Sequence, residues 1–103
     1  MDFEALGEAL GLEKEEYMEL VELLVETGMS DLEKLRVAIE EGNADAAAGA
    51  AHSLKGASGN LRLMEIYDIA AKCEEEARKD SLEGLAESVQ IMKVKLESIA
   101  GLL

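Results

Sequence analysis

The only histidine of this chain, His52, stands within residues 50–60, which read AAHSLKGASGN. A neutral imidazole, with an unperturbed pKa of about 6.5, is a competent nucleophile at cellular pH without a neighbouring base. Lys55 follows three residues later, so on a helix its ammonium group can approach an anion attached to the ring. A cation in this position is the natural partner of a phosphoryl group. The pair therefore favours phosphoryl chemistry, provided that a helix presents both side chains to solvent.

The neighbours of His52 are small, and their spacing separates two faces of a helix. At about 100° per residue, His52 lies roughly 160° from Leu54, which belongs to the apolar face. The positions that share the face of His52 are Asp45, Ala48, Gly49, Lys55, Gly56 and, if the helix reaches that far, Gly59. Most of them lack a side chain that could shield the ring. We therefore expect a surface open to another folded protein; the alternative is an ordinary surface histidine beside glycines that merely weaken the helix.

Four segments carry apolar residues at alternating steps of three and four, which predicts four amphipathic helices. Their ranges are 13–42, 44–60, 63–79 and 82–103, and a weaker helix over 2–10 is expected to lie across one end. Short connections make neighbouring helices antiparallel. The sequence thus predicts an all-α fold, an antiparallel up-and-down four-helix bundle with a short extra N-terminal helix, in a single domain over 1–103.

The sequence also indicates where the helices end and that one glycine lies in the interior of a helix. Gly42 is typical of the residue that follows a helix, and Asn43 of an N-cap. Asp80 and Ser81 are the cap candidates before the last helix. The apolar phase runs unbroken through Gly28, which favours one long helix with Gly28 facing inward over a new start at the capping box that follows it.

The composition argues against several classes of partner and site. Acidic residues outnumber basic ones by 23 to 10, giving a net charge of −13, and such a surface repels nucleic acid and anionic membranes. No apolar run approaches the roughly 20 residues that span a bilayer, so a cytoplasmic protein is expected. Cys73 is the only cysteine, which excludes an internal disulfide and argues against a zinc site. The acidic runs, Glu74-Glu75-Glu76 among them, are interpreted as solvated surface, and a monomer is expected at this net charge.

The stretch around His52 resembles the phosphorylation motif of histidine phosphotransfer (HPt) domains, the helical-bundle carriers of multistep two-component phosphorelays. The residues that match the family's pattern are Ala51, His52, Leu54, Lys55, Gly56, Ser58 and Asn60. The similarity covers essentially the whole chain, including the Cys73-Glu74-Glu75 step. One position departs from it, because Arg62 stands where the family usually has glycine. This departure concerns the turn into the fourth helix and the rim of the docking surface, and it leaves the histidine untouched.

The resemblance implies that His52 accepts a phosphoryl group from a phosphoaspartate of a response-regulator receiver domain and passes it to another receiver. It implies that Lys55 steadies the phosphohistidine. The residues implied to admit the receiver are Ala48, Gly49, Gly56 and Gly59. No cofactor of the chain's own is implied, and Mg²⁺ is expected on the receiver. A hybrid sensor histidine kinase is the expected further partner.

Other functions find less support in the sequence. A histidine autokinase needs a nucleotide site, and the chain has no Walker-type loop, no kinase signature and too little length for an ATP-binding domain. A metal hydrolase would need an HExxH or Glu-x-x-His set, which is also missing. The main alternative is a helical adaptor that binds a receiver or kinase domain without carrying phosphate, although an adaptor has no use for the pair of His52 and Lys55. A purely structural bundle is the third possibility.

Overall fold

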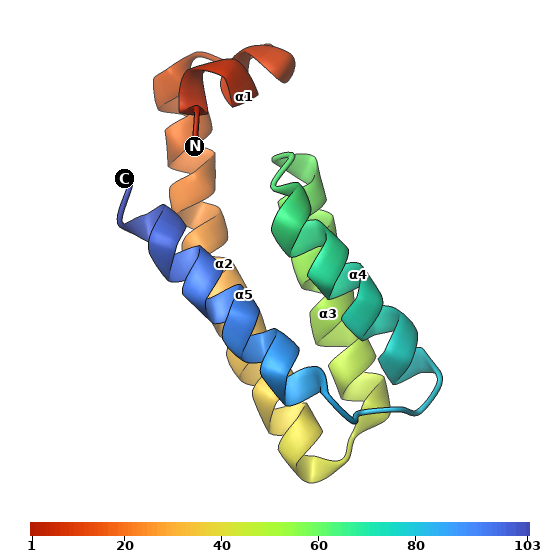
Figure 1. Ribbon diagram of the computed structural model, residues 1–103. Helices are drawn as coiled ribbons and strands as arrows, with labels where there is room; N and C mark the ends of the chain where they lie inside the picture. Colours follow the sequence, from red (N-terminus) through yellow and green to blue (C-terminus); the bar gives the residue numbers. More distant parts are fainter.

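Five α-helices make up the chain in the computed structural model, which describes residues 1–103 throughout. The helices are α1 (Phe3–Ala9), α2 (Lys14–Glu41), α3 (Ala44–Asn60), α4 (Met64–Arg78) and α5 (Leu85–Ala100). Helices α2 to α5 run up and down as antiparallel neighbours, and α1 lies across the end of the bundle where α2 begins (Figure 1). The predicted all-α bundle with a short extra helix is therefore confirmed. No helix is long and apolar enough to cross a membrane.

The four long helices pack unequally around the core. Helix α3 makes its most extensive contact with α4 and a somewhat smaller one with α2, whereas α4 and α5 touch each other least. Figure 1 shows the result as two pairs, α3 beside α4 and α5 beside α2. The largest fully buried aliphatic side chains of the main core are Leu35, Leu54, Ile66, Met92 and Leu96. Burial of such side chains stabilises each by about 1.5–3 kcal/mol relative to exposure.

Helix α2 is continuous through Gly28, as predicted. Gly28 is buried, and a Cβ atom there would lie 3.0 Å from Cδ1 of Leu96 in α5. The missing side chain thus lets α5 approach α2 closely. The helix ends at Gly42, whose φ of 69° is left-handed, and the Asn43 side chain then accepts a hydrogen bond from Ala46 N–H at the start of α3. Both predicted caps are confirmed.

The predicted start of the last helix is wrong. Helix α5 begins at Leu85, and its N-cap is Gly84 with a φ of 81° rather than Asp80 or Ser81. Asp80 instead adopts a left-handed φ of 61° and ends α4, because its N–H and that of Ser81 donate to carbonyls of the last turn, those of Ala77 and Glu76. Asp tolerates this conformation better than most residues. Asp80 therefore ends α4 and does not cap α5.

One hydrogen bond ties the start of α2 to the turn between α3 and α4. The Tyr17 side chain is fully buried, and its hydroxyl donates to the carbonyl of Leu61 at 2.5 Å. The Tyr17 ring also packs against Phe3 of α1, with ring centroids 6.3 Å apart. This contact therefore joins α1, α2 and the end of α3.

We expect Tyr17→Phe to lower the free energy of unfolding by roughly 1–3 kcal/mol, because the buried Leu61 carbonyl loses its side-chain donor. Urea unfolding followed by circular dichroism measures the change. Tyr67→Phe is the matched control, since Tyr67 is the other tyrosine and its hydroxyl forms no hydrogen bond in the structure. Equal stabilities of the two variants would contradict the role assigned to Tyr17.

Candidate functional site

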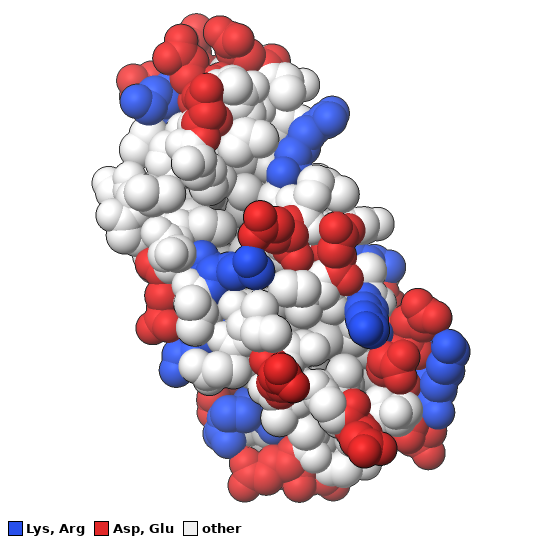
Figure 2. Space-filling view, in the orientation of Figure 1, with Lys and Arg blue, Asp and Glu red and all other residues white.

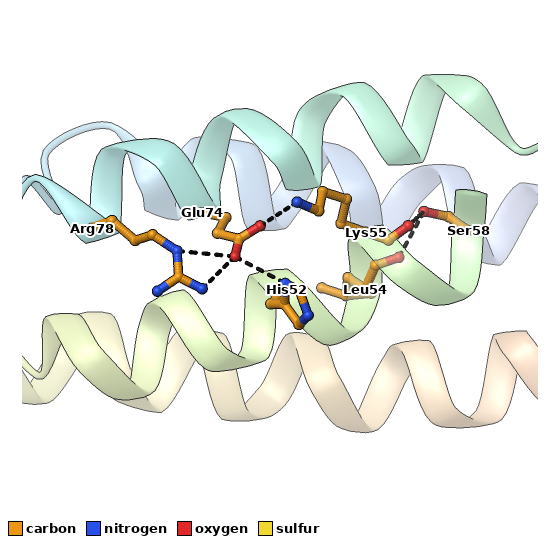
Figure 3. Close-up of polar contacts among 6 residues, drawn as sticks. All are labelled: His52, Leu54, Lys55, Ser58, Glu74 and Arg78. Carbon is orange, nitrogen blue, oxygen red and sulfur yellow. Dashed lines mark hydrogen bonds and ion pairs between the residues drawn. The ribbon is translucent and has the colours of Figure 1, made fainter. Parts of the chain in front are cut away.

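The imidazole of His52 projects from the middle of α3 with 63% of its side chain exposed. Its Nδ1 atom lies 2.9 Å from Oε2 of Glu74, which comes from α4 (Figure 3). The ring is thus fixed on one side by the neighbouring helix, and the opposite side of the residue faces solvent. The predicted exposure of His52 is confirmed.

Glu74 binds three side chains at once. Its Oε1 accepts from Lys55 Nζ at 2.7 Å, and its Oε2 accepts from Arg78 as well as facing His52 (Figure 3). Only 7% of the Glu74 side chain is exposed, so the interpretation of this residue as solvated surface is wrong. The position follows Cys73 and precedes Ala77 by three residues, which places it at the edge of the buried stripe of α4. That spacing was the signal in the sequence that could have indicated burial.

The cations around Glu74 determine its ionisation. The ammonium group of Lys55, followed by Arg78 and His52, lowers the pKa of the Glu74 carboxyl to about 2, although burial alone would raise it. An ionised carboxylate can only accept hydrogen bonds, so Nδ1 of His52 must carry the proton in this contact. In the neutral ring, Nε2 then holds the free lone pair. The arrangement leaves the lone pair of the outward nitrogen of His52 free toward solvent.

Lys55 lies one turn beyond His52, as predicted, but it is already engaged. Its side chain is 30% exposed and points toward Glu74. Arg78 reaches the same carboxylate from the other side, with 60% of its side chain exposed (Figure 3). Two cations thus stand on either side of the carboxylate that fixes His52.

The small residues predicted to surround His52 fall into two groups. A Cβ atom at Gly49 or Gly56 would meet nothing within 4 Å, so both positions are open. Ala48, in contrast, is buried, and a Cβ atom at Gly59 would lie 2.9 Å from the Tyr67 ring. The expectation that Ala48 lies on the exposed face is therefore wrong, and Gly59 is half-buried beside the Tyr67 ring. Helix α4 packs so closely on α3 that the buried arc of α3 extends beyond the angle estimated from the apolar residues.

A groove between α2 and α3 adjoins this exposed face. The Ser53 hydroxyl, next to His52 in sequence, donates to Asp31 of α2 at 2.7 Å and so bridges the two helices. Toward the α1 end, beyond this bridge, the groove is mostly apolar and includes Leu20, Leu23 and Ala57. Leu20 and Leu23 are 41% and 55% exposed. An apolar surface therefore lies beside the helix that carries His52.

The turn after α3 keeps its form despite Arg62. Arg62 has a left-handed φ of 59°, the conformation for which glycine is favoured. Its N–H donates to the carbonyl of Gly59 and the N–H of Leu63 to that of Ser58, a pattern that also closes α2 at Gly42. The usual glycine is thus replaced without loss of the turn.

A helical bundle that fixes one nitrogen of a single histidine and presents the other to solvent, with cations beside it, has the features that a phosphohistidine carrier requires. The family profile of the Hpt domain matches residues 19–101. The chain therefore belongs to the Hpt domain family, whose members are phosphocarrier modules rather than enzymes and take part in phosphorelay histidine phosphotransfer. Comparisons with curated proteins and with solved structures gave no match.

Glu74→Gln is expected to remove part of the pH dependence of stability. Because the folded-state pKa of Glu74 is depressed, its contribution is present above the unfolded-state pKa of about 4.3 and is lost as the pH falls toward about 2. The variant should be less stable at neutral pH, where Lys55 and Arg78 lose their counter-ion, and the difference should shrink over that acidic window. Urea unfolding at a series of pH values measures it. Glu75→Gln, an exposed neighbour with a surface ion pair, is the control, and a difference that does not vary with pH would contradict the assignment.

Gly56 and Gly59 offer a matched pair on one helix. Gly56→Ala should raise the free energy of unfolding by roughly 0.5–1 kcal/mol, because the position is open and alanine suits a helix interior better. Gly59→Ala should lower it, because the new methyl group meets the Tyr67 ring. Thermal unfolding of the two variants tests both signs. Equal effects would mean that α4 does not pack as closely on α3 as described.

Proposed function

We propose that His52 accepts a phosphoryl group from a phosphoaspartate of a response-regulator receiver domain and passes it to the aspartate of another receiver. The observation that carries this proposal is the contact between His52 Nδ1 and the ionised Glu74 carboxylate. That contact selects one tautomer and leaves Nε2 free on an exposed ring. Membership in the Hpt domain family supports the same chemistry.

In the proposed transfer, the Nε2 lone pair of His52 attacks phosphorus. The bond between phosphorus and the aspartate oxygen breaks, and the aspartate leaves as a carboxylate. The Nδ1 proton stays with the ring and continues to donate to Glu74, which stabilises the positive charge that develops on the imidazole. Transfer to a second receiver reverses these steps. The reaction depends mainly on positioning and on neutralising the phosphoryl oxygens.

Lys55 is proposed to neutralise part of the phosphoryl charge. Its Nζ atom lies 2.7 Å from Glu74, and its flexible stem allows the ammonium group to move from that carboxylate toward a phosphoryl group on Nε2. The chain needs no cofactor of its own for this step, and Mg²⁺ would be held by the receiver. A phosphorelay protein of this kind would act in the cytoplasm, with receiver domains and a hybrid sensor histidine kinase as partners.

The receiver is proposed to dock over α3 and the adjoining groove. Gly49 and Gly56 provide open backbone on either side of His52, so a folded partner can approach the ring. The apolar part of the α2–α3 groove, with exposed Leu20 and Leu23, supplies area for an apolar helix of the partner. Ala48 and Gly59 are not included in this footprint, because Ala48 is buried and Gly59 lies half-buried against the Tyr67 ring of α4.

The deciding experiment mixes the chain with receiver domains that have been phosphorylated by acetyl phosphate, and measures intact mass under alkaline conditions, where phosphohistidine persists. We expect a mass gain of one phosphoryl group that is absent in His52→Gln. Lys55→Gln should gain it more slowly while still binding the receiver, because Lys55 acts on the phosphoryl charge rather than on docking.

Acetyl phosphate without a receiver is the control for direct chemical phosphorylation. The adaptor alternative makes the opposite prediction for the same mixture. Binding to several phosphorylated receivers without any gain in mass would reject the carrier function and favour an adaptor that carries no phosphate. A gain that persists in His52→Gln would place the phosphoryl group elsewhere in the chain.

A further inference from the structure

Glu74 is the one carboxylate of the chain that holds two basic side chains. Lys55 binds it from α3 and Arg78 from α4. Every other carboxylate in an ion pair has a single basic partner: Glu33, Glu40, Glu65 and Glu75. Basic residues are scarce, with 10 against 23 acidic ones, and Figure 2 shows them scattered among acidic side chains. One negative charge needs one cation for balance, so the second cation on Glu74 is in excess.

The two cations occupy different oxygen atoms of Glu74. Lys55 Nζ lies 2.7 Å from Oε1 and is the only side-chain group on that atom. Oε2 lies 2.9 Å from His52 Nδ1, and Arg78 donates to the same oxygen from Nε at 3.0 Å and from Nη2 at 2.5 Å (Figure 3). Withdrawal of Lys55 would therefore leave Oε1 without a donor, while the oxygen that His52 faces would keep the guanidinium group.

Arg78 is held to Glu74 by the geometry of α4 itself. The two residues are four positions apart with the acidic one first, which is the favourable order for an ion pair on a helix. The guanidinium group stays charged in proteins, and its planar fork suits a carboxylate. Lys55, in contrast, shares α3 with His52 and carries its charge on a flexible stem. A phosphoryl group on His52 thus competes for Lys55 and leaves Arg78 in place.

We propose that Arg78 is a positioning residue, which holds Glu74 as the hydrogen-bond acceptor of His52 Nδ1 while Lys55 is bound to the phosphoryl group. This inference rests on the phosphotransfer proposed above. Only 7% of the Glu74 side chain is exposed, so a carboxylate that lost both cations would take up a proton or turn away from the ring. Arg78 prevents both changes during the interval in which Lys55 is engaged elsewhere.

The consequence for the proposed reaction lies at the Nδ1 proton of His52. With phosphorus bound to Nε2, a proton on Nδ1 makes the ring a cation. In transfer to the next receiver, the bond between phosphorus and Nε2 breaks, its electron pair goes to Nε2, and the ring leaves as a neutral imidazole. An ionised Glu74 retains that proton. Arg78 thereby keeps the phosphohistidine ready for transfer without contacting the reacting atoms.

A double-mutant cycle read by nitrogen-15 NMR of the His52 ring tests the proposal. The ring signals are unambiguous, because the chain has one histidine. Lys55→Met imitates the withdrawal of Lys55 without any phosphoryl group. We expect Lys55→Met and Arg78→Met each to keep the proton on Nδ1, and the double variant to lose this tautomer. Lysine in place of Arg78, combined with Lys55→Met, should restore it.

Lys79→Met is the matched control, since Lys79 is the next residue of the chain and pairs with Glu75 four positions before it. Combined with Lys55→Met, it should leave the proton on Nδ1. A general loss of stability from the removal of a basic residue would affect both combinations alike. A change of tautomer confined to the combination with Arg78→Met would therefore be specific to Glu74.

Transfer from phosphorylated His52 to an unphosphorylated receiver supplies a second measurement. The chain is loaded with phosphoramidate, from which ammonia leaves as the bond between phosphorus and Nε2 forms. We expect Arg78→Met to pass the phosphoryl group on about tenfold more slowly than the unmodified chain, and Lys79→Met to pass it on at the unmodified rate.

Three results would overturn the proposal. Loss of the Nδ1 proton in Arg78→Met alone would mean that Lys55 cannot hold Glu74 by itself. Retention of the proton in the double variant would mean that Glu74 needs neither cation, and slow transfer by Arg78→Met would then assign Arg78 to the phosphoryl group. Equal transfer rates of Arg78→Met and the unmodified chain would remove Arg78 from the reaction. The tautomer cycle uses no receiver, so its failure is distinct from failure of the proposed function, which would show as no transfer from the unmodified chain.

Discussion

The buried carboxylate of Glu74 is the constraint on which the site depends. A charge removed from water is tolerated only when other groups replace its hydration, and here His52, Lys55 and Arg78 do so. The same contacts serve the histidine, because the acceptor at Nδ1 fixes both the ring orientation and the tautomer. The electrostatic requirement of one residue thus determines the chemical state of another.

Small residues of α3 make the contact between His52 and Glu74 possible. On one side of the helix they permit close packing, and on the other side they leave open space. Toward α4, Gly59 lies against the Tyr67 ring, and a Cβ atom there would force the two helices apart; the close approach of α3 and α4 lets Glu74 reach His52. Toward solvent, Gly49 and Gly56 leave space that a larger side chain would fill. The three glycines lower the helix propensity of the segment that carries His52, and packing against α2 and α4 compensates for this.

Much of the fold could be predicted because apolar periodicity and Gly42 and Asn43 act locally. The site was harder, because its key contacts join two helices. Glu74 stood in a run of three acidic residues that resembled solvated surface, and its burial depends on the distance between α3 and α4, which one helix's pattern does not contain. Ala48 was misplaced for the same reason. At the end of α4, Asp80 suits either a cap or a left-handed turn, and only the hydrogen bonds to the preceding turn decide between them.

The residues that meet at the histidine all belong to the single helical hairpin of α3 and α4. His52 and Glu74 are 22 residues apart in sequence, and Glu74 and Arg78 are four, so bringing them together closes only short loops. The contact between α2 and α5, in contrast, brings together parts of the chain that are far apart in sequence. The site is in this sense a module within the domain, because the side chains that fix and flank the imidazole all come from this hairpin and none comes from α1, α2 or α5.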